Sequence, residues 1–298
     1  MTERKNGKSP WLRLNNGVEM PALGLGVFQS PPDQTTAAVE AALRGGYRLI
    51  DTAAAYMNEA EVGEGIRRSG LQRADVFVET KLWISDYEDA LHGFTRSLRK
   101  LGLEYVDLYL LHQPTPTEFD RTVKAYLAAE KLLADGRVRA IGVSNFSVAH
   151  LDALMREASV TPAVNQVEVH PFFTQRGLRD AHTARGIVTQ CWSPIGGINR
   201  YRPAADRSDP FGHPTIHALA EKYRKTPAQV VLRWHLDNGL APIPKSVRAE
   251  RIAENIDVFD FKLTTEELAA VEALDQGVRG GPDPESINHK TYTFSIPD

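Results

Sequence analysis

Side chains that could do acid–base chemistry follow short β-type segments in the first half of the chain. Asp51, Lys81 and His112 each stand at or just beyond the end of one such segment, and Tyr56 lies five residues after Asp51. A phenol has an ordinary pKa of about 10, and a nearby ammonium group lowers that pKa because it stabilises the phenolate. If the fold brings these four side chains together, Tyr56 becomes a general acid that works near neutral pH.

The elements that must position these residues alternate between strands and helices. Between the strand-like segments, apolar residues recur at helical spacing, as in Leu91, Phe94, Leu98 and Leu101. Such alternation requires a parallel sheet with right-handed crossovers, and eight units close a (β/α)8 barrel of about 250 residues. We therefore predict an α/β TIM barrel with strands at 22–26, 47–50, 76–79, 106–111, 140–143, 163–169, 187–192 and 240–244.

The active site of a barrel of this kind lies at the carboxyl ends of its strands. Polar residues occupy these positions after otherwise apolar strands, which packing alone does not explain. The residues expected to meet at this mouth are Asp51, Lys81, His112, Ser144, Asn145, His170, Ser193 and Lys245. A doubly wound dinucleotide-binding domain is the alternative, but its Gly-x-Gly-x-x-Gly motif fails because Gln29 replaces the third glycine after Gly24 and Gly26.

The 298 residues exceed a bare barrel, and the surplus has an expected place. We predict one domain over 1–298, with a hairpin at 12–20 that closes the barrel floor, the barrel and final helix at 22–275, and a tail at 276–298. The long segment 195–214 reads as a loop on the carboxyl-terminal face. Helix starts are predicted from capping boxes at Ser85–Glu88 and Thr264–Glu267, and from Thr226 followed by Pro227.

The composition excludes several classes of partner. The net charge of −3 provides no general field for nucleic acid or an anionic membrane. A cytoplasmic protein is predicted from three features: a single cysteine, Cys191, a polar N-terminus, and the lack of an 18-residue apolar run. His213 and His217 have the spacing of a helical metal pair, yet no third ligand accompanies them, so we expect no metal.

The chain resembles the aldo-keto reductase family, and within it a bacterial branch similar to 2,5-diketo-D-gluconate reductases. Seven ordered motifs carry the resemblance over nearly the whole length: LIDTAAAYMNE at 49–59, TKLW at 80–83, DLYLLHQP at 107–114, IGVSNF at 141–146, NQVEVHP at 165–171, WSP at 192–194, and IPKS at 243–246 with RIAEN at 251–255. The resemblance implies reduction of aldehydes and ketones to alcohols by hydride from NADPH. A single motif would be weak, whereas seven in order are highly specific.

The resemblance also implies a role for each residue of the mouth. Tyr56 is the proton donor, Lys81 lowers its pKa, Asp51 pairs with Lys81, and His112 orients the substrate carbonyl. Trp192, where the family more often has tyrosine, stacks on the nicotinamide. The implied cofactor residues are Val27, Asp51, Ser144, Asn145, Gln166, Trp192, Ser193, Ile195, Gly197, Lys245, Ser246, Val247, Arg248, Arg251, Glu254 and Asn255. The implied substrate residues are Phe28, Met57, Trp83, His112 and Phe146.

A preference for NADPH over NADH is expected from the segment 245–255. Lys245, Arg248 and Arg251 surround a predicted helix start, which suits the negative charge of a 2′-phosphate. Glu254 and Asn255 would then bind the adenine. The alternative for this segment is a basic helix start that only faces solvent.

Other functions remain open at this point. A barrel of this family could sense NADPH without catalysis or serve a structural role, whereas a metal-dependent barrel hydrolase lacks its ligand set. Fold alone does not separate these classes, so the intact tetrad favours an enzyme. A small carbonyl compound is the expected partner, and a monomer the expected form.

Overall fold

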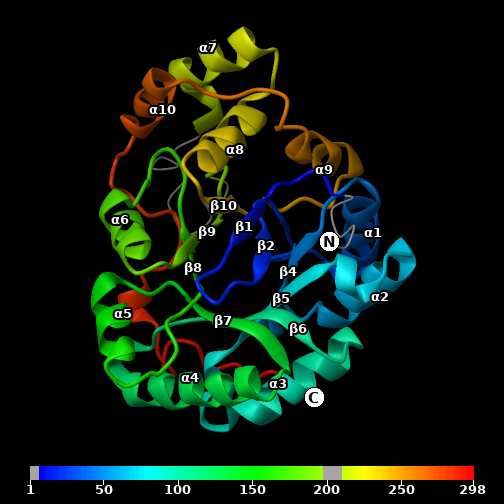
Figure 1. Cartoon of the computed structure of the whole chain (residues 1–298), viewed down its shortest axis with the longest axis vertical. Helices are drawn as coiled ribbons and strands as arrows, with labels where there is room; N and C mark the ends of the chain where they lie inside the picture. Colours follow the sequence, from blue (N-terminus) through cyan, green and yellow to red (C-terminus); the bar gives the residue numbers. More distant parts are fainter. Residues whose placement is uncertain (1–6, 197–209) are drawn as a thin grey trace.

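The computed structural model describes residues 7–196 and 210–298, which form a barrel surrounded by helices (Figure 1). Eight strands make one sheet in which every neighbouring pair is parallel and follows chain order. They are β3 (Leu25–Gly26), β4 (Leu49–Asp51), β5 (Phe77–Leu82), β6 (Val106–Leu111), β7 (Val138–Ser144), β8 (Val164–Glu168), β9 (Val188–Trp192) and β10 (Ala241–Pro242).

Backbone hydrogen bonds between the first and last strands close the barrel. The N–H of Gly24 donates to the carbonyl of Pro242 over 3.2 Å, and that of Gly26 donates to Pro244 over 3.1 Å. Strand β10 is short because Pro242 and Pro244 have no N–H to donate. The predicted TIM barrel is confirmed, and each predicted strand segment contains an observed strand or at least half of one.

Ten helices are described, and most follow a barrel strand and cover its outer face. They are α1 (Pro32–Arg44), α2 (Glu59–Ser69), α3 (Ala90–Leu101), α4 (Phe119–Ala134), α5 (Val148–Met155), α6 (Arg176–Ala184), α7 (Pro214–Tyr223), α8 (Pro227–Asp237), α9 (Ala249–Ile256) and α10 (Thr265–Glu272). No helix within the described ranges combines the length and apolarity needed to cross a bilayer.

Two of the three predicted helix starts are confirmed. Thr226 and Thr264 each form a capping box with the residue three positions later. The box predicted at Ser85 is wrong: residues 84–89 form a 3-10 helix, and Asp89 caps α3 by accepting from the N–H of His92. The neighbouring Asp86 pairs with the Arg96 guanidinium, which ties this 3-10 turn to the face of α3.

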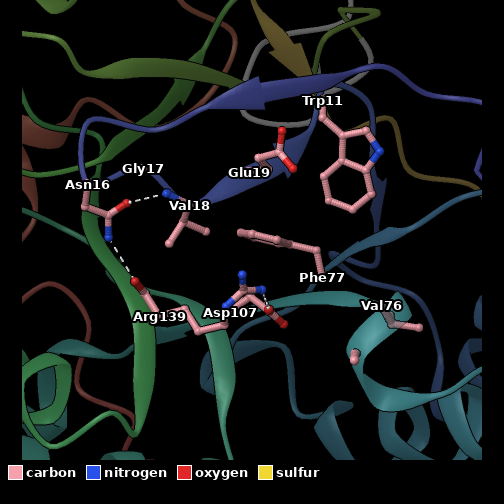
Figure 2. A pocket seen from close by; sticks show the side chains of 10 residues that line it. Trp11, Asn16, Gly17, Val18, Glu19, Val76, Phe77, Asp107 and Arg139 are labelled. Carbon is pink, nitrogen blue, oxygen red and sulfur yellow. Dashed lines mark hydrogen bonds and ion pairs between the residues drawn. The ribbon is translucent and has the colours of Figure 1, made fainter. Parts of the chain in front are cut away.

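The predicted floor hairpin is present as β1 (Trp11–Arg13) and β2 (Glu19–Pro21), paired antiparallel. Leu14 and Met20 pack into the barrel interior with apolar side chains of the strands. A cavity of about 340 Å³ lies between the hairpin and β5–β7 (Figure 2). At its wall Asp107 accepts from Arg73 over 2.8 Å and from Arg139 over 2.6 Å. Asn16 Nδ2, in the hairpin turn, donates to the carbonyl of Arg139 over 2.9 Å and so ties the hairpin to β7.

Candidate active site

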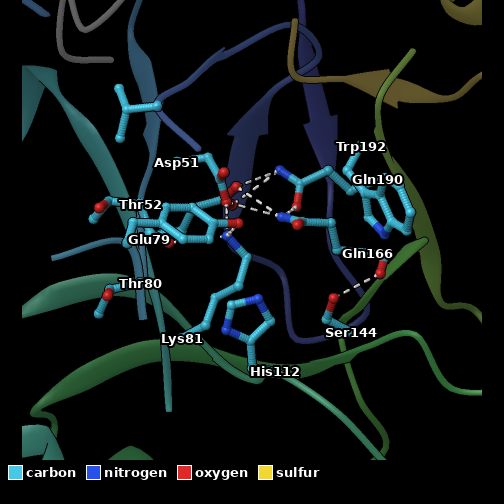
Figure 3. Close-up of polar contacts among 12 residues, drawn as sticks. Asp51, Thr52, Glu79, Thr80, Lys81, His112, Ser144, Gln166, Gln190 and Trp192 are labelled. Carbon is cyan, nitrogen blue, oxygen red and sulfur yellow. Dashed lines mark hydrogen bonds and ion pairs between the residues drawn. The ribbon is translucent and has the colours of Figure 1, made fainter. Parts of the chain in front are cut away.

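The carboxyl ends of neighbouring strands bring the predicted tetrad together. Asp51 ends β4, Lys81 lies on β5, and His112 directly follows β6. Tyr56 ends a short 3-10 helix, Ala54–Tyr56, in the loop after β4. Figure 3 shows Asp51, Lys81 and His112 gathered at one point of the barrel interior.

Lys81 is fully buried and sits at the centre of this group. Its Nζ donates to the Asp51 carboxylate, to the Thr52 carbonyl over 2.9 Å and to Tyr56 Oη over 3.2 Å. Burial lowers the pKa of Lys81, but the negative charge of Asp51, followed by the effects of Tyr56 and Glu79, outweighs burial and holds the pKa above its ordinary value. The ammonium is therefore charged throughout the neutral range.

The pKa of Tyr56 corrects the expectation that the neighbouring ammonium lowers it below its ordinary value. The Lys81 ammonium does act to lower it, but desolvation by burial is the larger effect and raises the pKa to about 12. The sequence shows the neighbouring charge but not the burial of the phenol. Tyr56 therefore keeps its proton near neutral pH, as a proton donor must.

His112 stands beside the phenol as a neutral imidazole. Burial, helped by the Lys81 charge, lowers its pKa well below 6.5. Its ring centroid lies 5.6 Å from that of Tyr56 and 5.1 Å from that of Trp83, both edge-on. Among the residues that the structure describes, the buried Nδ1 has no hydrogen-bond partner, so this polar atom is available to a ligand or water.

Two polar residues of the barrel interior, Glu79 and Gln190, are not among those predicted. Glu79 is fully buried, and its carboxyl accepts from Gln190 Nε2 over 2.7 and 2.9 Å. Burial, reinforced by Asp51, raises the pKa of Glu79 well above its ordinary value. Gln166 Nε2 links this pair to the tetrad by donating to Asp51 Oδ1 over 2.9 Å and to Gln190 Oε1 over 2.8 Å (Figure 3). The sequence contained a pattern that could have identified Glu79, because it lies two residues before Lys81 on one strand and therefore shares its inward face.

A cavity of about 640 Å³ opens above the tetrad. Aromatic side chains line one part of it: Phe28, Trp83, Tyr292 and Phe294. Trp83 stacks on Phe294 with a centroid distance of 4.9 Å, and Phe28 lies 5.0 Å from Tyr56. Tyr292 and Phe294 come from the tail, whose conformation no sequence pattern predicts. An apolar wall therefore faces the phenol and the imidazole.

Two predicted substrate residues do not line this cavity. Met57 is 42% exposed, and its left-handed backbone, with φ of 57°, ends the 3-10 turn. Phe146 is fully buried against Phe119 and His150. The reason is local, because Asn145 adopts φ of 66° and turns the following side chain into the core.

Predicted cofactor residues line another part of the same cavity: Asp51, Ser144, Asn145, Gln166, Trp192, Ser193, Ile195 and Lys245. Trp192 Nε1 donates to Asn145 Oδ1 over 2.8 Å, which fixes the indole ring. Ser193 adopts φ of 47°, a left-handed conformation that is uncommon for a residue other than glycine. Val27 is buried in the core and is not among the residues that line the cavity, so its predicted cofactor contact stays a prediction. Gly197 lies outside the described residues.

The remaining predicted cofactor residues surround the start of α9. No side chain within residues 7–196 and 210–298 caps this helix, and Lys245, Arg248 and Arg251 are exposed beside its first turn. Ser246 Oγ accepts from the N–H of Arg248, whose guanidinium pairs with Glu250 over 2.6 Å. Val247 is partly buried against the core, and Asn255 is buried. Glu254 already accepts from Thr226 Oγ1 over 2.7 Å with one carboxyl oxygen. An uncapped helix start with three cations fits a phosphate.

In the part of the chain that the structure describes, no three His, Cys, Asp or Glu side chains cluster around a common point where they could hold a metal ion. His213, one of the two histidines at helical spacing, caps α7 by accepting from the N–H of Thr215.

Comparisons with known proteins agree with this geometry. The family model described as "Aldo/keto reductase family" matches residues 22–276. Morphine 6-dehydrogenase of Pseudomonas putida is 53% identical over 96% of this chain and 98% of its own, and methylglyoxal reductase of Escherichia coli is 45% identical over 93% and 97%.

Solved structures agree as well. A crystal structure of an aldo/keto reductase from Brucella melitensis superposes with a TM-score of 0.83 at 46% identity, over 90% of this chain and all of the other. An aldo-keto reductase of Bombyx mori in complex with NADP gives 0.86 at 36% identity, over 92% and 95%. The family match and these similarities show that the chain belongs to the aldo/keto reductase family, whose enzymes are carbonyl reductases that use NADPH.

Proposed function

We propose that this reductase protonates its carbonyl substrate from Tyr56, with Lys81, Asp51 and His112 as the supporting catalytic group. The observation that carries the proposal is the contact of 3.2 Å between the Tyr56 hydroxyl and a buried ammonium, at the base of a cavity that His112 also lines. When bound, the nicotinamide supplies the hydride that the carbonyl carbon accepts.

The protein's part is to meet the negative charge that develops on the carbonyl oxygen. Tyr56 donates its proton to that oxygen, and the neutral His112 ring donates a hydrogen bond to it. Lys81 stabilises the phenolate left behind, and Asp51 fixes the position and charge of Lys81. Both donors are in place before substrate enters, so little reorganisation is needed during the reaction.

The pH dependence follows from the two pKa shifts. A raised pKa of about 12 for Tyr56 and a lowered pKa for His112 leave both groups in one protonation state from about pH 6 to 9. We therefore expect kcat for reduction to be flat over this range. Oxidation of the alcohol needs the phenolate, so its rate should rise about tenfold per pH unit. Steady-state rates in both directions test this, and a reduction rate that falls with a midpoint near neutrality would contradict it.

We propose that NADPH binds with its nicotinamide against Trp192 and its 2′-phosphate at the start of α9. Lys245 and Arg251 would hold the phosphate, and Asn145 and Gln166 would take the carboxamide. The exposed cations of the uncapped helix start support this assignment.

Replacing Arg251 with Met should lower kcat/KM for NADPH by about tenfold to a hundredfold, the scale of one lost charge-assisted contact. With NADH, which lacks the 2′-phosphate, kcat/KM should change less than about twofold. Arg156→Met, an exposed arginine after α5, is the matched control and should alter neither value. An equal loss with both cofactors would show that Arg251 does not read the phosphate.

The non-catalytic alternative makes a different prediction. A protein that only senses NADPH would bind it without oxidising it when aldehydes, α-ketoaldehydes, diketones, keto-sugars and steroid ketones are added in turn. Because Tyr56 and His112 line one cavity and Lys81 contacts the Tyr56 hydroxyl from below, we expect turnover with at least one of these classes.

We further propose that the enzyme acts as a monomer in the cytoplasm on a small carbonyl compound. The buried, unpaired Cys191 and the net charge of −3 support a reducing compartment and a partner that is not a polyanion.

A further inference from the structure

A buried carboxylate outside the tetrad holds the tail on the barrel. Glu168 ends β8 and is 1% exposed. Its Oε1 accepts from the N–H of Gly280 over 2.7 Å and contacts His170 Nε2 over 3.0 Å, and its Oε2 accepts from the N–H of Gly281 over 3.0 Å. Arg279 adds a cation 3.8 Å away. Because both of its oxygens accept hydrogen bonds from the tail, this carboxylate fixes two consecutive backbone N–H groups there.

The tail backbone fixed in this way lies directly on the indole of Trp192. A Cβ at Gly281 would collide with Trp192 Cη2 and stand 3.0 Å from Cζ3, so no residue with a side chain fits without moving the ring. The opposite end of the indole is held by the hydrogen bond from Nε1 to Asn145, the residue that follows β7. Trp192 is thus held at both ends, once from the end of β7 and once from the tail.

We propose that Glu168 and Gly281 are positioning residues for the cofactor: the carboxylate fastens the tail, and the tail sets the plane of the indole on which the nicotinamide stacks. This inference rests on the proposed function, because the role of Trp192 belongs to it. The tail then serves two parts of the site, since Gly281 supports the cofactor wall and Tyr292 and Phe294 form the substrate wall.

A second attachment of the tail provides a matched control. His289 contacts the Glu118 carboxylate through Nδ1 and the carbonyl of Ile84 through Nε2. This attachment lies close to Tyr292 and Phe294 in the sequence and further from Gly281. Glu118→Gln should therefore loosen the substrate wall and leave the indole in place.

The experiment measures the Kd of NADPH by calorimetry for the wild type and for Gly281→Ala, Glu168→Gln and Glu118→Gln, with melting temperatures as a check on folding. Gly281→Ala and Glu168→Gln should each raise Kd by about tenfold or more, the scale of an overpacked or broken contact. Glu118→Gln should raise KM for the carbonyl and leave Kd of NADPH within about twofold.

A double variant separates positioning from a general structural effect. A phenyl ring is smaller than the indole and has no atom where Cη2 stands, so Trp192→Phe should remove most of the effect of Gly281→Ala on Kd. The inference is overturned if Gly281→Ala binds NADPH as tightly as the wild type, or if it weakens binding by the same factor in the Trp192→Phe background. A wild type that binds no NADPH would instead contradict the proposed function.

Discussion

Tyr56→Phe is expected to lower kcat by at least about 10²-fold, the usual loss when a positioned general acid is removed. The phenyl ring keeps the packing against Phe28 and the edge-on contact with His112, so the Kd of NADPH should stay within about twofold. Only the hydroxyl that meets Lys81 is lost. Steady-state kinetics and calorimetry on the same preparation measure both quantities.

A matched control separates this loss from that of any buried phenol. Tyr126 is fully buried, and its hydroxyl donates to the carbonyl of Val160 over 3.1 Å, away from the cavity. Tyr126→Phe should cost about 1 kcal/mol of stability and leave kcat unchanged. A Tyr56→Phe enzyme with a near-normal kcat would remove Tyr56 from its role.

Lys81→Met should damage both stability and activity. The buried ammonium pairs with Asp51, and its removal leaves this carboxylate without its charge partner inside the barrel. Breaking a buried pair from one side costs about 3–5 kcal/mol. The phenolate of Tyr56 also loses its stabilising charge, so kcat should fall by about 10²-fold or more. Denaturant unfolding and steady-state rates measure the two effects.

The double variant Asp51→Asn with Lys81→Met separates the two roles. Removing the second charge should recover much of the lost unfolding free energy, because no unpaired charge remains from this pair. Activity should stay low, because neither change restores the ammonium. If Lys81→Met alone is as stable as the wild type, the buried ion pair does not contribute this strongly to folding.

The barrel was predictable because short β-type segments alternate with helical patterns along the chain, and most of these segments end in or precede a polar residue. The same reasoning placed Asp51, Lys81 and His112 at one mouth, since parallel strands share a carboxyl end. Strand ends were less predictable: β10 is interrupted by prolines that cannot donate hydrogen bonds.

Where the structure differs from what the sequence suggests, the causes are physical ones that local sequence does not contain. Phe146 turns into the core because Asn145 adopts a left-handed conformation. Tyr292 and Phe294 lie in a non-periodic tail whose path depends on contacts with Trp83 and Glu168 from other parts of the chain. The pKa of Tyr56 depends on burial, which only the packed barrel defines.

The most direct measurement follows deuterium from NADPH labelled at C4 into the product of an aryl aldehyde, chosen because aromatic side chains line the cavity. We expect one alcohol formed per NADPH consumed, deuterium on the carbinol carbon, and a hydroxyl proton from solvent by way of Tyr56. Tyr56→Phe should bind the same cofactor and transfer almost none of the label. Product without deuterium, or equal transfer by Tyr56→Phe, would contradict hydride transfer assisted by this phenol.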